Sequence, residues 1–582
     1  MRHPSTFYFE ASPQTMAEHG TAVGVQLIGS AHLTGHGPAS AAELAQVYQQ
    51  QGLDALVHQL QADFTVLVVD GARQQVHVVS DAFASKPIYV AWDAKAARLR
   101  CATSIHGITS RAPGHFSIDW ERLVYSRYEP QQHTFATIVK GVQRLKNARI
   151  ATLDLDQKTW SIRKHAELQH CADAFAGFTA KDFVEAYRQA IEAAVAERLE
   201  GQSEVLVTLS GGFDSSIVYA LAAQQATVHA ATICTATSIH NAEMERAAAM
   251  SRAAGSQHLV LPVAFHEGPH YQEWVQLLLA REALDCGFED LVKSQLLLRA
   301  GRAFPAARLL LTGMGSDQFN GGTTTFDYAQ TGENESYEAF MSNMLRSKWS
   351  RYREAQFTPW FQFAYNLSSM SYREELWPFQ HDAWEAYVRN NARSLPRKGV
   401  LLESKLSAAN GFNIAYPFLD AGALEVLRNI PPELRGELLY DKQILRKAFR
   451  DVLPTSFHGQ PKFYRTPKAA EKIYSYVKPL LYGHNYALLK LAFECSPGLR
   501  QRFSMDKLLA FLGSAANSEH FPTYVHVLKL LSIGLLEAHL LEGTSLHTQL
   551  PAEASAMHYS ATDTIDCDGL GKQVLGKEVV EG

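Results

Sequence analysis

Alternating apolar and polar positions predict an antiparallel sheet in the first third of the chain. A period of two places every second side chain on the same face of a strand, so each such run has one face to bury. Turn residues such as Asp70-Gly71 and Asp93-Ala94 separate the runs, which predicts hairpins in a β-sandwich-like domain. The predicted strands are Phe64 to Val69, Val76 to Val79, Pro87 to Val90, Arg98 to Ala102 and Arg149 to Leu155.

From about Asp182 the pattern changes to helices that alternate with solidly apolar runs. Asp182 to Leu199 is amphipathic at helical spacing. The apolar runs that predict buried strands are Val205 to Leu209, His229 to Ile233, His258 to Val263 and Arg308 to Leu311. Strand and helix in alternation predict a doubly wound parallel sheet, and residues 330–545 add a large helical part. The predicted fold class is therefore α/β.

Weak secondary-structure signals near residues 166–180 suggest a boundary between two domains. We predict one domain over residues 1–170 and a second over residues 175–545. From about Thr548 the chain becomes small and polar, so residues 548–582 are predicted to be a disordered tail.

Composition excludes several function classes. The chain has 54 Lys and Arg against 59 Asp and Glu, a net charge of −5, which provides no basic field for nucleic acid. The most apolar stretch, Thr523 to Leu541, contains Lys529 and Glu537, which indicates a helix of a soluble protein and no membrane span. The six cysteines form no Cys-x-x-Cys pair, and no secretory signal is visible, so we expect a cytoplasmic protein.

A glycine-rich loop after the run ending at Leu209 has the character of a phosphate site. It reads Ser210-Gly211-Gly212-Phe213-Asp214-Ser215-Ser216 and leads into a helix. Glycines let backbone N–H groups and the positive helix end face an anion, and both serines add donors. Asp214 would repel bare phosphate, which implies a Mg²⁺ ion between them. An ordinary turn with a capping serine is the alternative interpretation.

Two later segments add charged groups. The strand ending at Leu311 leads into Thr312-Gly313-Met314-Gly315-Ser316-Asp317. Open α/β sheets bind ligands at the carboxyl edge of their strands, so Asp317 is expected to be the second metal ligand. Lys462 follows the segments Ala415 to Asp420 and Asp441 to Arg446, on a loop flanked by prolines. Its charge would meet a phosphate or a developing oxyanion, unless it is a solvated surface lysine.

In this order the three elements resemble the asparagine synthetase superfamily, whose members release AMP and pyrophosphate from ATP. Ser210 to Ser216 is similar to the pyrophosphatase-loop signature of these enzymes, and Ser80 to Tyr89 is similar to part of their N-terminal glutaminase domain. The resemblance implies ATP and Mg²⁺ as cofactors, with the adenine near Ile233. The ATP-binding residues it implies are Leu209, Ser210, Gly211, Gly212, Asp214, Ser215, Ser216, Ile233 and Gly313. Asp214 and Asp317 are the implied metal ligands, and Lys462, Asp317 and Asp214 the implied catalytic residues.

The N-terminal domain departs from the resemblance. A working glutaminase of this class has its nucleophilic cysteine at the mature N-terminus, whereas no cysteine precedes Cys101 here. The Asn-Gly-Glu substrate string is missing, and Ser80 stands where an arginine is usual. We therefore expect a degenerate glutamine amidotransferase-like domain that makes no ammonia.

The synthetase loops depart as well. Met314 stands where asparagine synthetases carry a glutamate, and Asn413-Ile414-Ala415 replaces their Glu-x-Arg. Two acidic groups suited to proton transfer are absent, which disfavours synthesis of asparagine from ammonia. Relatives with damaged glutaminase domains include β-lactam synthetases, carbapenam synthetases and lasso-peptide macrolactam synthetases. A β-lactam synthetase can use a tyrosine at the position of Met314, and a methionine cannot take over that role.

We favour the lasso-peptide macrolactam synthetase. Its nucleophile is a peptide α-amine with a pKa near 7.7–8.0, so about a tenth is neutral at pH 7 and a dedicated base is less essential. The resemblance then implies a precursor peptide as substrate and a leader-peptide protease as partner, with no nucleic acid and no membrane. A small-molecule amide synthetase of the β-lactam, carbapenam or asparagine type stays open, as does a non-catalytic relative that only binds nucleotide or a partner protein.

Overall fold

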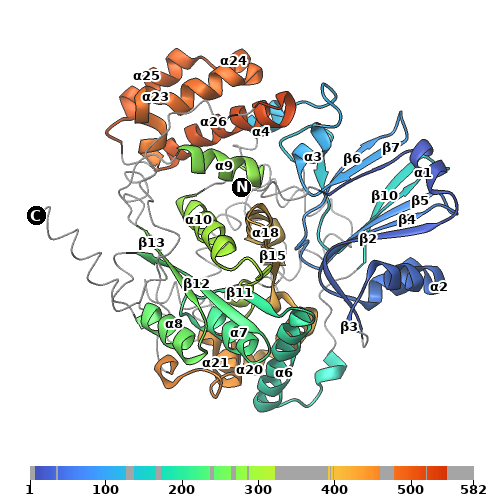
Figure 1. Cartoon of the computed structure of the whole chain (residues 1–582), viewed down its shortest axis with the longest axis vertical. Helices are drawn as coiled ribbons and strands as arrows, with labels where there is room; N and C mark the ends of the chain where they lie inside the picture. Colours follow the sequence, from blue (N-terminus) through green and yellow to red (C-terminus); the bar gives the residue numbers. More distant parts are fainter. Residues whose placement is uncertain are drawn as a thin grey trace, which may run out of the picture.

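The computed structural model describes most of the chain and confirms the predicted α/β fold class. It describes residues 7–34, 37–125, 137–165, 172–235, 242–263, 271–284, 287–321, 388, 391–392, 395–397, 399–458, 477–518, 521–544 and 546. Figure 1 shows antiparallel strands in the N-terminal part, drawn in blue, and a parallel sheet with helices around it in the green part of the chain. The predicted tail over 548–582 lies outside the described residues.

Two antiparallel sheets make up the N-terminal part. One has the strand order β1-β7-β6-β8 and the other β10-β9-β5-β4-β2-β3. The strands are β1 (Tyr8–Ala11), β2 (Val23–Leu33), β3 (Gly37–Pro38), β4 (Leu60–Asp70), β5 (Gln75–Ser80), β6 (Tyr89–Asp93), β7 (Arg98–Ala102), β8 (Gln143–Arg144), β9 (Arg149–Asp154) and β10 (Thr159–Lys164). The helices of this part are α1 (Pro13–His19), α2 (Ala41–Gln59), α3 (Ile105–Thr109) and α4 (Trp120–Tyr125).

The side chains of β4 show why these strands form a sandwich. Leu67 and Val69 lie in the core shared with the four-stranded sheet, whereas Val66 and Val68 lie in a second core with α2. The strand is thus apolar on both faces, because one face meets a sheet and the other a helix. The predicted β-sandwich-like architecture is observed.

A five-stranded parallel sheet forms the centre of the second part. Its order is β13-β12-β11-β14-β15, and its strands are β11 (Glu204–Thr208), β12 (Thr227–Thr235), β13 (His258–Val263), β14 (Leu309–Leu311) and β15 (Asn413–Ala415). The chain runs outward from β11 through β12 to β13 and then returns to β14 on the other side of β11. Loops after β11 and β14 therefore diverge at a topological switch point, which is where open parallel sheets bind ligands.

Helices cover this sheet and extend beyond it. In Figure 1, α7 and α8 lie on one side of the sheet and α10 and α18 on the other. The helices are α6 (Ala180–Leu199), α7 (Phe213–Ala223), α8 (Ala242–Ala253), α9 (Tyr271–Arg281), α10 (Phe288–Ala303), α11 (Ser316–Phe319), α18 (Gly399–Ala409), α19 (Ala421–Arg428), α20 (Pro432–Leu439), α21 (Gln443–Ala448), α23 (Lys478–Cys495), α24 (Pro497–Arg502), α25 (Met505–Ala515) and α26 (Phe521–Glu542). The short 3₁₀ helices are η1 (Ala172–Phe175), η2 (Leu395–Arg397), η3 (Pro417–Leu419), η4 (Tyr440–Lys442) and η5 (Thr455–Phe457).

The apolar helix α26 is a packed helix of the protein. Among the described residues, Tyr524–Glu542 is the one segment long and apolar enough to cross a membrane, and 78% of its most apolar window is buried. It contacts α23, α24, α9 and α3. The helix predicted over Thr523 to Leu541 is thus observed, packed against other helices.

The elements that the sequence pattern missed depend on partners distant in the sequence. Strand β2 contains Gly24 and Gly29 and no regular alternation, yet it pairs with β4 over its whole length. Strand β15 has three residues and exists through its parallel pairing with β14. The domain limits stay predictions. They are the boundary near residues 166–180 and the ranges 1–170 and 175–545.

Candidate active site

The loop after β11 is a tight turn that requires glycine. The Ser210 N–H donates to the Ser215 Oγ at 3.0 Å, and the Gly212 N–H donates to the Ser210 Oγ at 3.2 Å. Gly211 has a φ of +75°, and a Cβ there would overlap the backbone carbonyl of Glu243 on α8. The left-handed conformation and the closeness of α8 together exclude a side chain at this position.

The start of α7 can receive an anion. Gly212 is the N-cap residue, and no side chain caps this helix of 11 residues. Ser216 is fully buried, and its Oγ has no hydrogen-bond partner among the described residues. Uncapped N–H groups at a helix N-terminus and an unsatisfied hydroxyl both fit a phosphate group.

The loop after β14 meets the first loop. A Cβ built on Gly313 would lie 2.8 Å from the Asp214 Cβ, so only a glycine permits this approach. The Ser316 Oγ donates to the Asp214 Oδ1 at 2.6 Å. Asp317 follows in the first turn of α11. The structure thus places the two predicted metal ligands, Asp214 and Asp317, side by side at the switch point.

Lys442 joins the two carboxylates. Its Nζ lies 2.6 Å from both oxygens of Asp214 and 2.6 Å from the Oδ1 of Asp317. Burial alone would lower the pKa of Lys442, but the two carboxylates raise it above its usual value, so the side chain stays charged. The sequence analysis named the surrounding segment and did not single out Lys442, because nothing local distinguishes it from a surface lysine.

The same carboxylates fit a magnesium ion. Mg²⁺ in nucleotide sites is usually held by one or two carboxylates, with phosphate and water oxygens completing its shell. Asp214 and Asp317 already converge on one cationic group and are the residues that would hold the ion. No group of three or more His, Cys, Asp or Glu side chains able to bind a metal occurs in the described part of the chain. Two carboxylates leave most of the shell to phosphate and water oxygens, so they fit a metal that would bind together with a nucleotide.

Two arginines add positive charge beside the first loop. The Arg446 guanidinium lies 4.1 Å from the centre of the Phe213 ring. The Arg246 Nε donates to the Gly211 carbonyl at 3.1 Å. Arg446 is also paired with Asp441 at 3.2 Å, so part of its charge is already balanced within the protein.

The remaining predicted nucleotide residues differ in what they expose. Leu209 is fully buried, and its N–H donates to the Ala231 carbonyl at 2.9 Å while its own carbonyl accepts from Thr232. Leu209 therefore supports the loop, but its backbone N–H and C=O groups are already hydrogen-bonded and its side chain has no exposed surface for a ligand. Ile233 lies on β12, beside β11, and is half-buried, so its side chain retains a surface for a ring. Lys462 lies within 459–476, outside the described residues.

A carboxylate lies on α18, the helix whose first residue packs against Met314. A Cβ on Gly399 would lie 3.2 Å from the Met314 Sδ, so the start of α18 covers Met314. Glu403 is one helical turn further along the same face of α18. Its Oε1 pairs with Lys293, and its buried Oε2 has no hydrogen-bond partner among the described residues. The sequence analysis missed Glu403, because its proximity to Met314 depends on helix packing.

The N-terminal part shows no exposed thiol in its described residues. Cys101 lies on β7, fully buried, and burial raises the pKa of its thiol far above the usual value. The Ser80 hydroxyl donates to the Lys146 carbonyl, inside the sheet. Neither group is placed to attack an amide.

Comparisons with known proteins agree with this geometry. The sequence model of the family described as Asparagine synthase matches residues 186–482. The glutamine-hydrolyzing asparagine synthetase 2 of Bacillus subtilis (strain 168) is 26% identical over 535 residues, which cover 88% of this chain and 70% of that protein. A putative glutamine-hydrolyzing asparagine synthetase of Mycobacterium bovis is 22% identical over 506 residues, which cover 78% of this chain and 72% of that protein.

Solved structures were matched as well, and one of them illustrates how weak the likeness is. It is the glutamine phosphoribosylpyrophosphate amidotransferase of B. subtilis, with 10% identity and a TM-score of 0.17, covering 44% of this chain and 63% of that chain. A superposition of this quality carries no argument about the fold or the site.

Proposed function

Because the chain belongs to the asparagine synthase family, whose members are ATP-dependent ligases, we propose that ATP binds at the switch point between β11 and β14 and activates a carboxylate for amide formation. One observation carries this proposal: Asp214, Asp317 and Lys442 converge beside the uncapped start of α7. Carboxylates that can hold Mg²⁺, a buried ammonium and helix N–H donors are the groups that a triphosphate needs.

In the first step, a substrate carboxylate oxygen attacks the α-phosphorus of ATP. The P–O bond to the β-phosphate breaks, which leaves an acyl adenylate and pyrophosphate. Ser210, Ser215 and the N–H groups of α7 hold the pyrophosphate, while Lys442 and Lys462 balance its charge. A Mg²⁺ ion held by Asp214 and Asp317 would neutralise part of the triphosphate charge.

In the second step, an amine attacks the acyl carbon, and AMP leaves with the former carboxylate oxygen. The attacking nitrogen must lose one proton. We propose Glu403 as its acceptor, because its Oε2 is unsatisfied and α18 covers Met314, where the family glutamate is missing. Glu403→Gln should slow amide formation without slowing pyrophosphate release, and an equal loss of both would remove Glu403 from this role.

We propose that the amine belongs to the substrate and does not come from glutamine. The printed sequence has no cysteine before Cys101, and that thiol is buried with a raised pKa. Among enzymes that close a carboxylate onto an internal amine, we favour the lasso-peptide macrolactam synthetase. It joins the side-chain carboxylate of a precursor peptide to the peptide's N-terminal amine, and a separate protease removes the leader. A β-lactam-, carbapenam- or asparagine-type small-molecule synthetase is the second candidate.

AMP release with different substrates tests this proposal. The purified chain, ATP and Mg²⁺ are incubated with a leader-free candidate peptide, with free amino acids, or with aspartate plus glutamine. We expect AMP release in the incubation with the peptide and in neither of the other two. AMP release with free amino acids would favour a small-molecule synthetase. Formation of asparagine and glutamate from aspartate plus glutamine would establish a working glutaminase.

A further inference from the structure

Arg198 on α6 is a buried cation between the two halves of the chain. Its side chain is 3% exposed. Its Nε lies 2.8 Å from the Oδ2 of Asp63 on β4, and its Nη1 lies 3.2 Å from the Oδ2 of Asp420. One guanidinium thus links a strand of the N-terminal sheet to the residue that begins α19.

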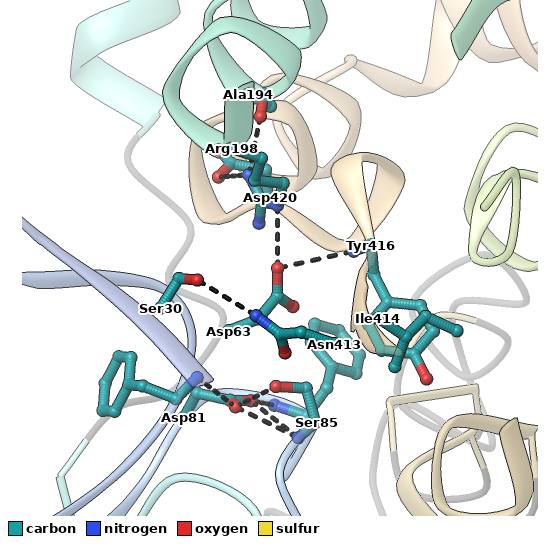
Figure 2. Close-up of polar contacts among 12 residues, drawn as sticks. Ser30, Asp63, Asp81, Ser85, Ala194, Arg198, Asn413, Ile414, Tyr416 and Asp420 are labelled. Carbon is teal, nitrogen blue, oxygen red and sulfur yellow. Dashed lines mark hydrogen bonds and ion pairs between the residues drawn. The ribbon is translucent and has the colours of Figure 1, made fainter. Parts of the chain in front are cut away.

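Asp63 makes a second contact to the same segment. Its Oδ2 also accepts the backbone N–H of Tyr416 at 3.4 Å. Figure 2 shows Asp63 between Arg198 on one side and Tyr416 on the other, with Asp420 beside Arg198. Tyr416 and Asp420 flank η3, so both ends of this short helix are held by one carboxylate and one guanidinium.

The held segment supports the candidate active site. Leu419 of η3 lies against Gly315, where any Cβ would overlap its side chain. Gly315 has a φ of +99° and is the N-cap residue of α11. The next two residues, Ser316 and Asp317, contact Asp214 and Lys442 respectively. Direct contacts therefore run from Asp63 to the carboxylates of the site.

The shared acceptor explains why this path transmits position. The Asp63 Oδ2 accepts from both the Arg198 Nε and the Tyr416 N–H, so removing it leaves two buried donors without this acceptor, which costs free energy. Leu419 packs directly against Gly315, so a shift of η3 should move the loop after β14.

We propose that Asp63 and Arg198 are positioning residues for the synthetase site: they fix the segment 416–420, which holds the Gly313–Asp317 loop where Asp317 meets Asp214 and Lys442. The degenerate N-terminal domain then acts as a scaffold for the ATP site. The effect on activity rests on the proposed function, whereas the effect on the loop does not.

Hydrogen exchange of the ligand-free full chain tests this directly. In Asp63→Asn, peptides covering 309–321 and 413–424 should exchange at least about tenfold faster than in the wild type, as expected when a buried guanidinium and a backbone N–H lose the acceptor that they share. The matched control is Trp120→Phe, which removes a hydrogen bond from the Trp120 Nε1 to Glu537 between the same two parts of the chain. Unchanged exchange in Asp63→Asn, or equal acceleration in the control, overturns the proposal.

Two further variants cover a folding failure of Asp63→Asn. Leu419→Ala removes the contact to Gly315 without touching the N-terminal sheet, and it should loosen 309–321 alone. Arg198→Lys keeps the charge and should show a smaller change. If Leu419→Ala leaves 309–321 unchanged, the path is refuted.

Pyrophosphate release supplies the functional readout. In Asp63→Asn we expect a higher KM for ATP, which Trp120→Phe should not show. A wild-type chain that turns over no ATP would overturn the proposed function, and the exchange result would still decide the positioning role.

Discussion

Lys442 is the cation of the candidate active site. It places one positive charge between Asp214 and Asp317, which would otherwise repel each other across a short distance. Under the proposed function, a metal nucleotide would bring further positive charge to the same oxygens, and the ammonium would then share or leave them. The lysine would then meet the phosphates.

Removing either carboxylate should abolish ATP turnover. Asp214→Asn and Asp317→Asn each remove a ligand for Mg²⁺ and a partner of Lys442, so we expect a loss of at least about a hundredfold in AMP formation. Asp451→Asn is the control, because this exposed carboxylate pairs with Arg188 away from the loops. Full turnover in both loop variants would contradict the metal assignment.

Removing Lys442 should make stability depend on magnesium. In Lys442→Met the carboxylates face each other without a cation, so millimolar Mg²⁺ should raise Tm by a few degrees more than in the wild type. Lys447→Met, on the following helix α21, loses only an exposed pair with Glu437 and serves as control. Thermal unfolding with and without Mg²⁺ measures this. The same Mg²⁺ response in both variants would argue against a cation site.

At the scale of elements, the sequence predicted what is local and missed what is assembled. The strand–loop–helix at Glu204–Gln225 was visible because its apolar run and its glycines are contiguous. Strand β15 was invisible, since three residues acquire strand geometry only beside β14. Lys442 was missed for the same reason, because tertiary packing brings it to Asp214 and Asp317. Glu403 was missed because only the fold places α18 against Met314.

The turn between β11 and α7 should be intolerant of any side chain. Gly211→Ala must adopt a left-handed φ and also displace the Glu243 carbonyl of α8. We expect a loss of stability of about 1–3 kcal/mol together with weakened ATP binding. Gly201→Ala has the same sign of φ, +74°, with nothing within 4 Å, so it isolates the backbone penalty. Urea unfolding compares them, and equal losses would mean that contact with α8 is unimportant.

At the scale of the whole molecule, buried polar groups join the N-terminal sandwich to the parallel sheet. The Lys86 Nζ donates to the Asn413 Oδ1 at 2.6 Å and to the Ile414 carbonyl, both on β15. Burial lowers the pKa of Lys86 to about 8, although Asp63 and Asp81 raise it. Sequence reasoning assigned no role to this residue, because its partner lies more than 300 positions away.

This lysine should leave a signature in the pH dependence of stability. Its pKa is about 8 when folded and near 10.5 when unfolded, so between these values the unfolded chain binds more protons. Stability should therefore rise with pH across that window, and Lys86→Met should lose this rise. Urea midpoints at both ends of the window measure it. An identical pH slope in the variant would show that Lys86 titrates normally.

The central claim is that this chain uses ATP to join a carboxylate and an amine of one substrate. Mass spectrometry of a leader-free candidate peptide incubated with the protein, ATP and Mg²⁺, with AMP measured in parallel, tests it most directly. The account predicts loss of one water from the peptide and one AMP for each dehydrated molecule, without added glutamine. AMP with no dehydration of the peptide, or no AMP with any carboxylate and amine supplied, would contradict it.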